Sequence, residues 1–137
     1  MFRTRDKLEE IVSKLETRIS SERVFSRIYA GAATTEASAS DERRNLGRLV
    51  GPLDGRIISI KDLFDNKGEP TLAGSIVRRT AAVASEDAVI VERLRAAGAV
   101  IIGKTHMTEF AFTAVGLNPH YGVPANAIDP HYVPGGS

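Results

Sequence analysis

The sequence predicts an α/β fold, a mixed or parallel sheet flanked by helices, with a helical N-terminal lead-in. Two short runs at 57–61 and 100–102 are rich in β-branched residues and apolar on both faces, as in strands buried inside a parallel sheet. A helical pattern lies between them, and the order strand, loop, helix, strand matches a βαβ unit. Apolar residues at three- and four-residue steps predict the N-terminal helix: Leu8, Ile11, Val12, Leu15 and Ile19.

The composition limits the classes of function. The chain has 137 residues, of which 42% are hydrophobic and 26% charged, as expected for one globular domain. Its formal net charge of +1 gives no positive field that would attract nucleic acid or an anionic membrane. No apolar run approaches the roughly 18 residues of a membrane span, and no secretory signal begins the chain, so a cytoplasmic location is expected. Without cysteine there is no disulfide and no thiol nucleophile.

The segments before residue 50 are expected to be helical or irregular. A second helix is predicted to begin at Ser20 or Ser21. Its inward face would carry four residues: Val24, Phe25, Ile28 and Tyr29. Residues 31–40 are small and polar, and the pattern leaves open a loop or a solvated helix.

From residue 51 onward the predicted elements are short. Residues 51–55 read as a turn, 65–75 as a loop, and 116–136 as a long loop rich in glycine and proline. Ser85 resembles an N-cap, with Glu86 and Asp87 in the first helical turn, and Gly98 is placed as a helix C-cap. The packing face of this helix would be formed by Ile90, Val91, Leu94 and Ala97. Two strands and a long terminal loop predict an incomplete domain.

Two patterns suggest ligands but lack their usual context. Gly98 and Gly103-Lys104-Thr105 match the Walker A spacing, yet the intervening residues are strand formers and a helix precedes them, the reverse of a phosphate loop. His106 and Glu109 form an H-x-x-E pair, with two further histidines in the long loop. The sequence therefore favours neither a nucleotide nor a metal site.

Lys61 is a candidate base. It lies at the end of an apolar run, two residues after Ser59, so both side chains leave the same face of a strand. A lysine accepts a proton only when its amine is neutral, which desolvation favours. The apolar neighbours, Leu63 and Phe64 among them, would provide that desolvation, although a lysine at a strand end reaching solvent is the simpler interpretation.

Five blocks within residues 51–137 resemble the amidase-signature family, in the family's order. Residues 51–62 resemble the stretch written G-P-L-x-G-I-P-x-x-V-K-D, and residues 71–75 resemble T-x-x-G-S. Residues 87–110 are similar to D-A-x-x-V-x-R-L-R-x-A-G-A-x-x-x-G-K-T-N-M-x-E-F, and 116–122 and 133–137 resemble the approach to its glycine- and serine-rich signature. The resemblance implies two parts: a helical segment at 1–50, and at 51–137 the first part of the catalytic domain, truncated before the nucleophile.

The resemblance implies an amide hydrolase that works through an acyl-enzyme and a serine–serine–lysine triad, without metal or cofactor. By motif position Lys61 matches the lysine, and Ser137 matches the bridging serine, which the family holds in a cis peptide. The nucleophile and the oxyanion-hole turn would follow residue 137, so these 137 residues alone are expected to be inactive. Two departures stand out: Arg56-Ile57 replaces the usual Ile-Pro, and His106 stands where asparagine is usual.

The resemblance also implies partners. It predicts a small-molecule amide substrate, no membrane, and no nucleic acid unless the chain belongs to a glutamine-dependent aminoacyl-tRNA amidotransferase; it allows a homodimer. The alternative from another class is a non-catalytic remnant or interaction module, whose missing strands would leave apolar faces exposed.

Overall fold

The computed structural model describes residues 3–137, and within them every side chain except those of residues 19–21. A three-stranded mixed sheet has the order β1-β3-β2. β3 (Val100–Thr105) pairs in parallel with β2 (Ile57–Lys61) and antiparallel with β1 (Phe25–Ile28). Three α-helices accompany the sheet: α1 (Thr4–Glu22), α2 (Ala30–Asn45) and α3 (Val89–Ala96). Two short 3₁₀ turns span Ile76–Arg78 and Glu109–Ala111. The predicted fold class is confirmed.

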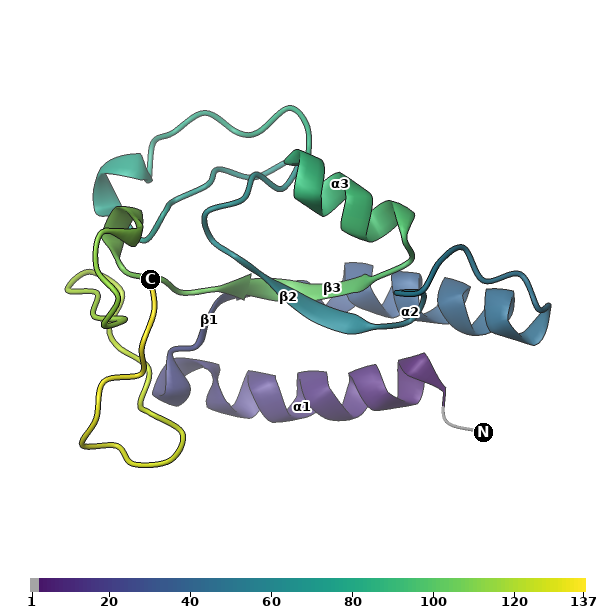
Figure 1. Ribbon diagram of the computed structural model, residues 1–137, viewed down its shortest axis with the longest axis horizontal. Coiled ribbons are helices and arrows are strands. Elements are labelled where there is room, and N and C mark those ends of the chain that lie inside the picture. Colours follow the sequence, from purple (N-terminus) through teal and green to yellow (C-terminus); the bar gives the residue numbers. More distant parts are fainter. Residues whose placement is uncertain (1–2) are drawn as a thin grey trace.

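The helices form a layer on each side of the sheet (Figure 1). On one side Leu8 of α1 and two alanines of α2 pack against Val100 and Ile102 of β3. On the other side Val91 of α3 packs against Ile60 and Ile101. β3 therefore contributes alternate side chains to both cores, and its burial agrees with its continuous apolar sequence.

Residues 25–28 are a strand, and the prediction of a second helix there was wrong. The first helix instead continues to Glu22, and Arg23 adopts a left-handed φ of 53°, which ends it. β1 then pairs along the edge of β3, with Phe25 opposite Thr105. Because β3 offers an unpaired edge, pairing overrides the helical spacing of these residues. Ile19, Ser20 and Ser21, which figured in the predicted helices, have side chains outside the described set.

Residues 31–40 belong to α2, and this helix is not solvated on all sides. Ala33, Ala37 and Ser40 are completely buried and recur at three- and four-residue steps. Their small side chains let the helix backbone approach α1 and β3 closely. The polar residues, which also allowed the interpretation of a loop, thus lie on the outer face of a packed helix.

α3 begins four residues later than its predicted N-cap. Ser85 is exposed and outside the helix, while Asp87 accepts hydrogen bonds from the backbone N–H of Lys67 (2.7 Å) and from Arg95 Nε (3.0 Å). Ile90, predicted to pack inward, is also exposed, and the face that packs on the sheet carries Val91 and Leu94. The predicted C-terminus is confirmed: Gly98 follows the helix with φ +84°.

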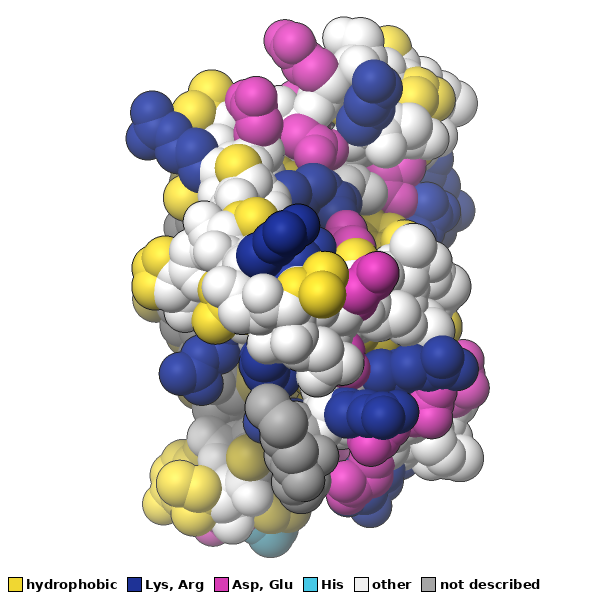
Figure 2. Space-filling view, turned by 90° about the vertical axis from the view of Figure 1, so that its right-hand side faces the viewer, with side chains coloured by type: hydrophobic (Ala, Val, Ile, Leu, Met, Phe, Trp, Pro, Cys, Tyr) yellow, Lys and Arg dark blue, Asp and Glu magenta, His cyan; other side chains and the backbone are white. Residues whose placement is uncertain are grey.

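The other predicted elements are confirmed. Residues 51–55 form turns, β2 and β3 are strands, and residues 65–75 and 116–136 contain neither helix nor strand. No helix among residues 3–137 is both long and apolar enough to cross a membrane. On the face shown in Figure 2, basic and acidic side chains lie next to one another, as the near-zero net charge leads one to expect.

One ion pair joins α2 to the turn that precedes β2. Arg43 donates from Nε and Nη2 to the two carboxylate oxygens of Asp54, both at 2.8 Å, and the Val50 N–H donates to the same carboxylate at 3.0 Å. The Asp54 side chain is fully buried. These hydrogen bonds from Arg43 hold the pKa of Asp54 well below its usual range, despite burial.

We expect Val91→Ala to lower the free energy of unfolding by about 2 kcal/mol, since it removes two buried methyl groups and leaves a cavity. Val89→Ala is the matched control, because Val89 lies in the same helix and is 62% exposed. Urea denaturation monitored by circular dichroism measures both. Equal losses for the two variants would contradict the packing of α3 on the sheet.

We expect Asp54→Asn to cost about 2–3 kcal/mol at pH 7, because it leaves a charged partner unpaired. The folded pKa of Asp54 is depressed, so its contribution is complete above about pH 4 and is lost as the pH falls below that value. The difference between wild type and variant should therefore shrink in urea titrations at pH 3. Glu86→Gln, at an exposed carboxylate, serves as control. If the difference in stability between wild type and Asp54→Asn did not change with pH, the depressed pKa of Asp54 would be contradicted.

Candidate active site

Lys61 and Ser137 meet at the carboxyl end of the parallel strands. Lys61 is the last residue of β2, and its Nζ lies 2.7 Å from Ser137 Oγ, although 76 positions separate the two residues. Figure 1 shows the C-terminal segment returning to the end of the sheet where β2 and β3 finish. Both side chains are half-buried. The amine and the hydroxyl are thus within direct proton-transfer distance.

The surroundings of Lys61 differ from the sequence-based expectation. Leu63 and Phe64 were predicted to help exclude water, yet they are 44% and 36% exposed. The strand ends at Lys61, and Leu63 and Phe64 lie in the turn that follows it. Ser59 is exposed, and Ser137 is the residue that meets the amine.

Close glycine packing places the segment that carries Ser137. Gly116 is buried, with φ +77°. A Cβ at Gly116 would lie 2.1 Å from the carbonyl oxygen of Gly135, and a Cβ at Gly136 would lie 3.0 Å from the Gly116 nitrogen. Neither position has room for a side chain, so the two backbones are in direct contact.

The peptide bonds of the described residues are all trans. The cis linkage expected before Ser137 is therefore not found in this structure. The trans form is the intrinsically favoured one for a residue other than proline, by about 2.5–4 kcal/mol.

Asp62 connects the end of β2 to two neighbouring segments. Its N–H donates to the carbonyl of Thr105 (3.1 Å), and its own carbonyl accepts from Ala73 N–H (3.0 Å). Its carboxylate lies 3.4 Å from Lys104 Nζ and is 4% exposed with the rest of the residue. Burial raises the pKa of Asp62, and the positive charge of Lys104 partly opposes this.

Lys104 has a structural role in place of a phosphate-binding one. It lies within β3, is 2% exposed, and is flanked by the carboxylates of Asp62 and Glu69. Glu69 also accepts hydrogen bonds from Tyr29 Oη and from Arg27 Nη1. A Walker A lysine requires a loop of free N–H groups, and here those groups belong to the sheet. The structure agrees with the view that Gly103-Lys104-Thr105 is no nucleotide site.

The two residues of the H-x-x-E pair contact different partners. The His106 ring stacks on Tyr121, with centroids 5.7 Å apart, and burial lowers the pKa of His106 although Asp62 opposes this. Glu109 instead accepts from Ser75 Oγ (2.6 Å) and lies 3.1 Å from His120 Nε2. These contacts lower the pKa of Glu109. Within residues 3–137 no three His, Asp or Glu side chains are grouped as metal ligands.

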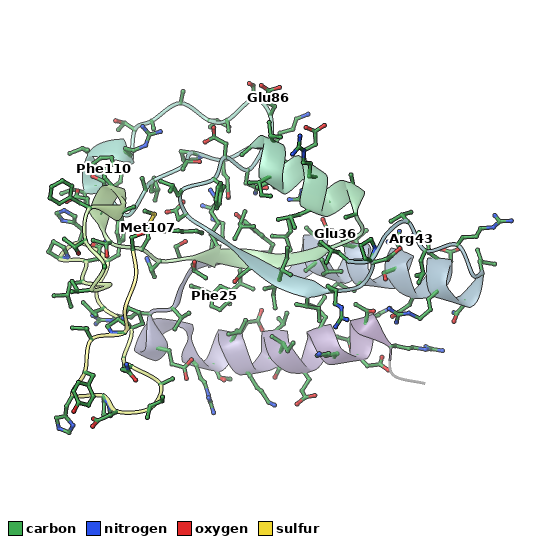
Figure 3. All side chains as sticks on the ribbon, viewed as in Figure 1. Phe25, Glu36, Arg43, Glu86, Met107 and Phe110 are labelled. Carbon is green, nitrogen blue, oxygen red and sulfur yellow. The ribbon has the colours of Figure 1, made fainter. Side chains whose placement is uncertain are left out.

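Asn118 was missed by the sequence analysis. It is 2% exposed in the long loop and bonds to two other segments, donating from Nδ2 to the carbonyls of Gly74 and Met107, both at 2.8 Å. Figure 3 shows Met107 at the end of the sheet beside the C-terminal segment. Asn118 stands in the block 116–122 that resembles the family, but its Gly-x-Asn-Pro setting is also typical of a surface turn, and neither signal predicts burial.

Comparisons with known proteins identify the family to which the chain belongs. The model of the Amidase family matches residues 6–137. The AtzE subunit of the 1-carboxybiuret hydrolase of Pseudomonas sp. (strain ADP) is 47% identical over 105 residues, 77% of this chain and 23% of that protein. A glutamyl-tRNA(Gln) amidotransferase subunit from Chloroflexus aurantiacus is 44% identical over 115 residues, 84% of this chain and 23% of that protein.

Solved structures have the same arrangement of elements. One of them is a chain of a vestigial protein complex described as revealing the evolutionary origins of an s-triazine catabolic enzyme. It superposes with a TM-score of 0.92 at 40% identity, and the match covers 99% of this chain and 30% of that one. The native peptide amidase of Stenotrophomonas maltophilia gives a TM-score of 0.84 at 28% identity, with 99% and 29% covered. This chain thus spans about a quarter to a third of its relatives, as a partial domain. Since the family model matches nearly the whole of it, the chain belongs to the amidase-signature family of enzymes acting on carbon–nitrogen bonds.

Proposed function

We propose that this chain supplies the lysine–serine half of the catalytic triad of an amide hydrolase. The observation that carries the proposal is the 2.7 Å contact between Lys61 Nζ and Ser137 Oγ, at the carboxyl end of the parallel β2–β3 pair, where loops converge. Family membership supports it, because relatives named as amidases share these segments. The attacking serine and the oxyanion hole are assigned to the part of the protein that follows residue 137.

In the proposed reaction Lys61 is the general base. Its neutral amine takes the Ser137 hydroxyl proton while Ser137 Oγ takes the proton of the attacking serine. The attacking oxygen forms a bond to the amide carbon, and the same relay then returns the proton to the departing nitrogen as the carbon–nitrogen bond breaks. Water repeats the sequence on the acyl-enzyme, and this releases the acid. The products are a carboxylic acid and an amine, and no cofactor is needed for the balance.

The relatives named as glutamyl-tRNA(Gln) amidotransferase subunits favour a second candidate function. At 44% identity, the Chloroflexus aurantiacus protein is nearly as similar to this chain as the hydrolase subunit is. The same lysine–serine relay would then release ammonia from glutamine for transfer to an aminoacyl-tRNA.

The first experiment compares the gene's complete product with Lys61→Ala and Ser137→Ala variants. We expect a fluorophosphonate probe to label the unaltered protein, and amide turnover to fall by about 10³-fold or more in either variant, as when a member of a catalytic triad is removed. Lys67→Ala is the matched control, because Lys67 is an exposed lysine six residues away. Turnover that survives Lys61→Ala, or labelling of residues 1–137 alone, would refute the proposal.

A second experiment separates the two candidates. A hydrolase should turn over simple amides without added partners, whereas an amidotransferase subunit should co-purify with partner subunits and depend on glutamine. Assays of acetamide, a dipeptide amide and glutamine, with and without co-expressed neighbouring genes, give the answer. Glutamine-dependent activity only in the presence of partners would replace the hydrolase assignment.

A further inference from the structure

We propose that Asn118 is a positioning residue that sets the distance between Lys61 and Ser137. The inference rests on the proposed function for its catalytic meaning, while its geometric basis is independent of it. Lys61 belongs to the sheet and Ser137 to the long terminal loop, so a precise contact requires a rigid connection between these two parts. Asn118 lies in the middle of that connection.

The side chain of Asn118 makes four hydrogen bonds in a nearly water-free place. Nδ2 donates to the carbonyls of Gly74 and Met107, and Oδ1 accepts from the N–H groups of His120 (2.8 Å) and Tyr121 (3.1 Å). The residue is 2% exposed. Both amide hydrogens are therefore used, and no water is needed to replace a missing partner. One side chain thereby fixes three backbone segments relative to one another.

One of these segments leads directly to Lys61. Gly74 follows Ala73, whose N–H donates to the carbonyl of Asp62, the residue after Lys61. Ala73 has a left-handed φ of +50°, a conformation that a residue with a Cβ keeps only when its surroundings enforce it. A Cβ at Gly74 would lie 2.7 Å from the Met107 carbonyl, so the backbones are in close contact here. The end of β2 is thus attached to the Asn118 amide through two residues.

Another segment leads to Ser137. Two residues before Asn118, Gly116 packs against the backbone of Gly135 and Gly136 without room for a side chain. Ser137 follows at once. The path from Lys61 to Ser137 therefore runs through the turn at 72–74, the Asn118 amide and the glycine contact, and hydrogen bonds or backbone contacts join its short stretches of chain.

Asparagine is the residue type that this place requires. Two carbonyl oxygens call for two N–H donors, and two N–H groups call for an acceptor on the same short side chain. Aspartate has the same size but would set a carboxylate against two carbonyl oxygens. Alanine would leave two buried carbonyls and two partly buried N–H groups without these partners.

The test measures steady-state kinetics of the complete gene product. We expect Asn118→Ala to lower kcat about 100-fold with KM changed less than about threefold, because a misplacement near 1 Å affects the proton relay more than substrate binding. Asn118→Asp should behave in the same way. Asn126→Ala is the matched control: Asn126 makes the same kind of bonds, to residues 128–133, within an exposed part of the same loop, and we expect less than a threefold change.

General destabilisation is distinguished by Val91→Ala, which disturbs the core on α3 and should leave kcat unchanged below its melting temperature. Crystal structures then give a readout that needs no activity: in Asn118→Ala the distance from Lys61 Nζ to Ser137 Oγ should exceed hydrogen-bonding range. A distance that stays near 2.7 Å, or a kcat loss no larger than that of Asn126→Ala, would overturn the inference. If the unaltered protein lacks turnover, the proposed function fails, while the distance still decides the role of Asn118.

Discussion

The parallel pairing of β2 with β3 is the interaction on which the rest of the structure depends. It places Lys61 opposite Thr105 and continues one step further, where the Asp62 N–H donates to the Thr105 carbonyl. Because parallel strands end at the same edge of a sheet, the loops after both strands begin side by side. The turn at 72–75 and the segment from Met107 to Tyr121 therefore meet at this end of the sheet. Ser137 lies at the same end, in contact with Lys61.

Charged side chains are also buried at this carboxyl end of the parallel strands. Lys104 points into this region from β3 with Asp62 and Glu69 as partners, and Arg27 of β1 reaches Glu69 from the neighbouring strand. Lys104, Asp62 and Glu69 are buried, and the side chain of Arg27, 58% exposed, adds a second positive charge; buried charges are tolerated when they are paired in this way. This cluster joins all three strands at the end that carries Lys61, and so limits how far the edge can move. Gly103 also keeps the strands close together, since a Cβ there would lie 2.3 Å from the Arg27 carbonyl and would push β1 away.

The local sequence pattern was sufficient to predict an element whose conformation depends on its own residues alone. The strands at 57–61 and 100–102 were predictable because both faces of each run are apolar, and Gly98 was predictable because a helix end there needs a positive φ. β1 was not, because its spacing also fits a helix and only the free edge of β3 decides between them. In the site, family resemblance brought Lys61 and Ser137 together, whereas Asn118 and the Asp62–Lys104–Glu69 cluster depend on contacts between segments 11 to 44 residues apart, which spacing does not encode.

The two buried or half-buried lysines show why partners, more than apolar flanks, determine what a lysine can do. Both end or interrupt an apolar strand, and sequence context alone made either a candidate for special chemistry. Lys104 lies between the buried carboxylates of Asp62 and Glu69 and serves as their counter-charge, together with Arg27 at Glu69. Lys61 has a neutral hydroxyl as its partner, and among the described residues no carboxylate is paired with it. Exchange of a proton with Ser137 therefore disturbs no buried ion pair. On these grounds we propose the proton-transfer role for Lys61 and a charge-balancing role, beside the neighbouring strand ends, for Lys104.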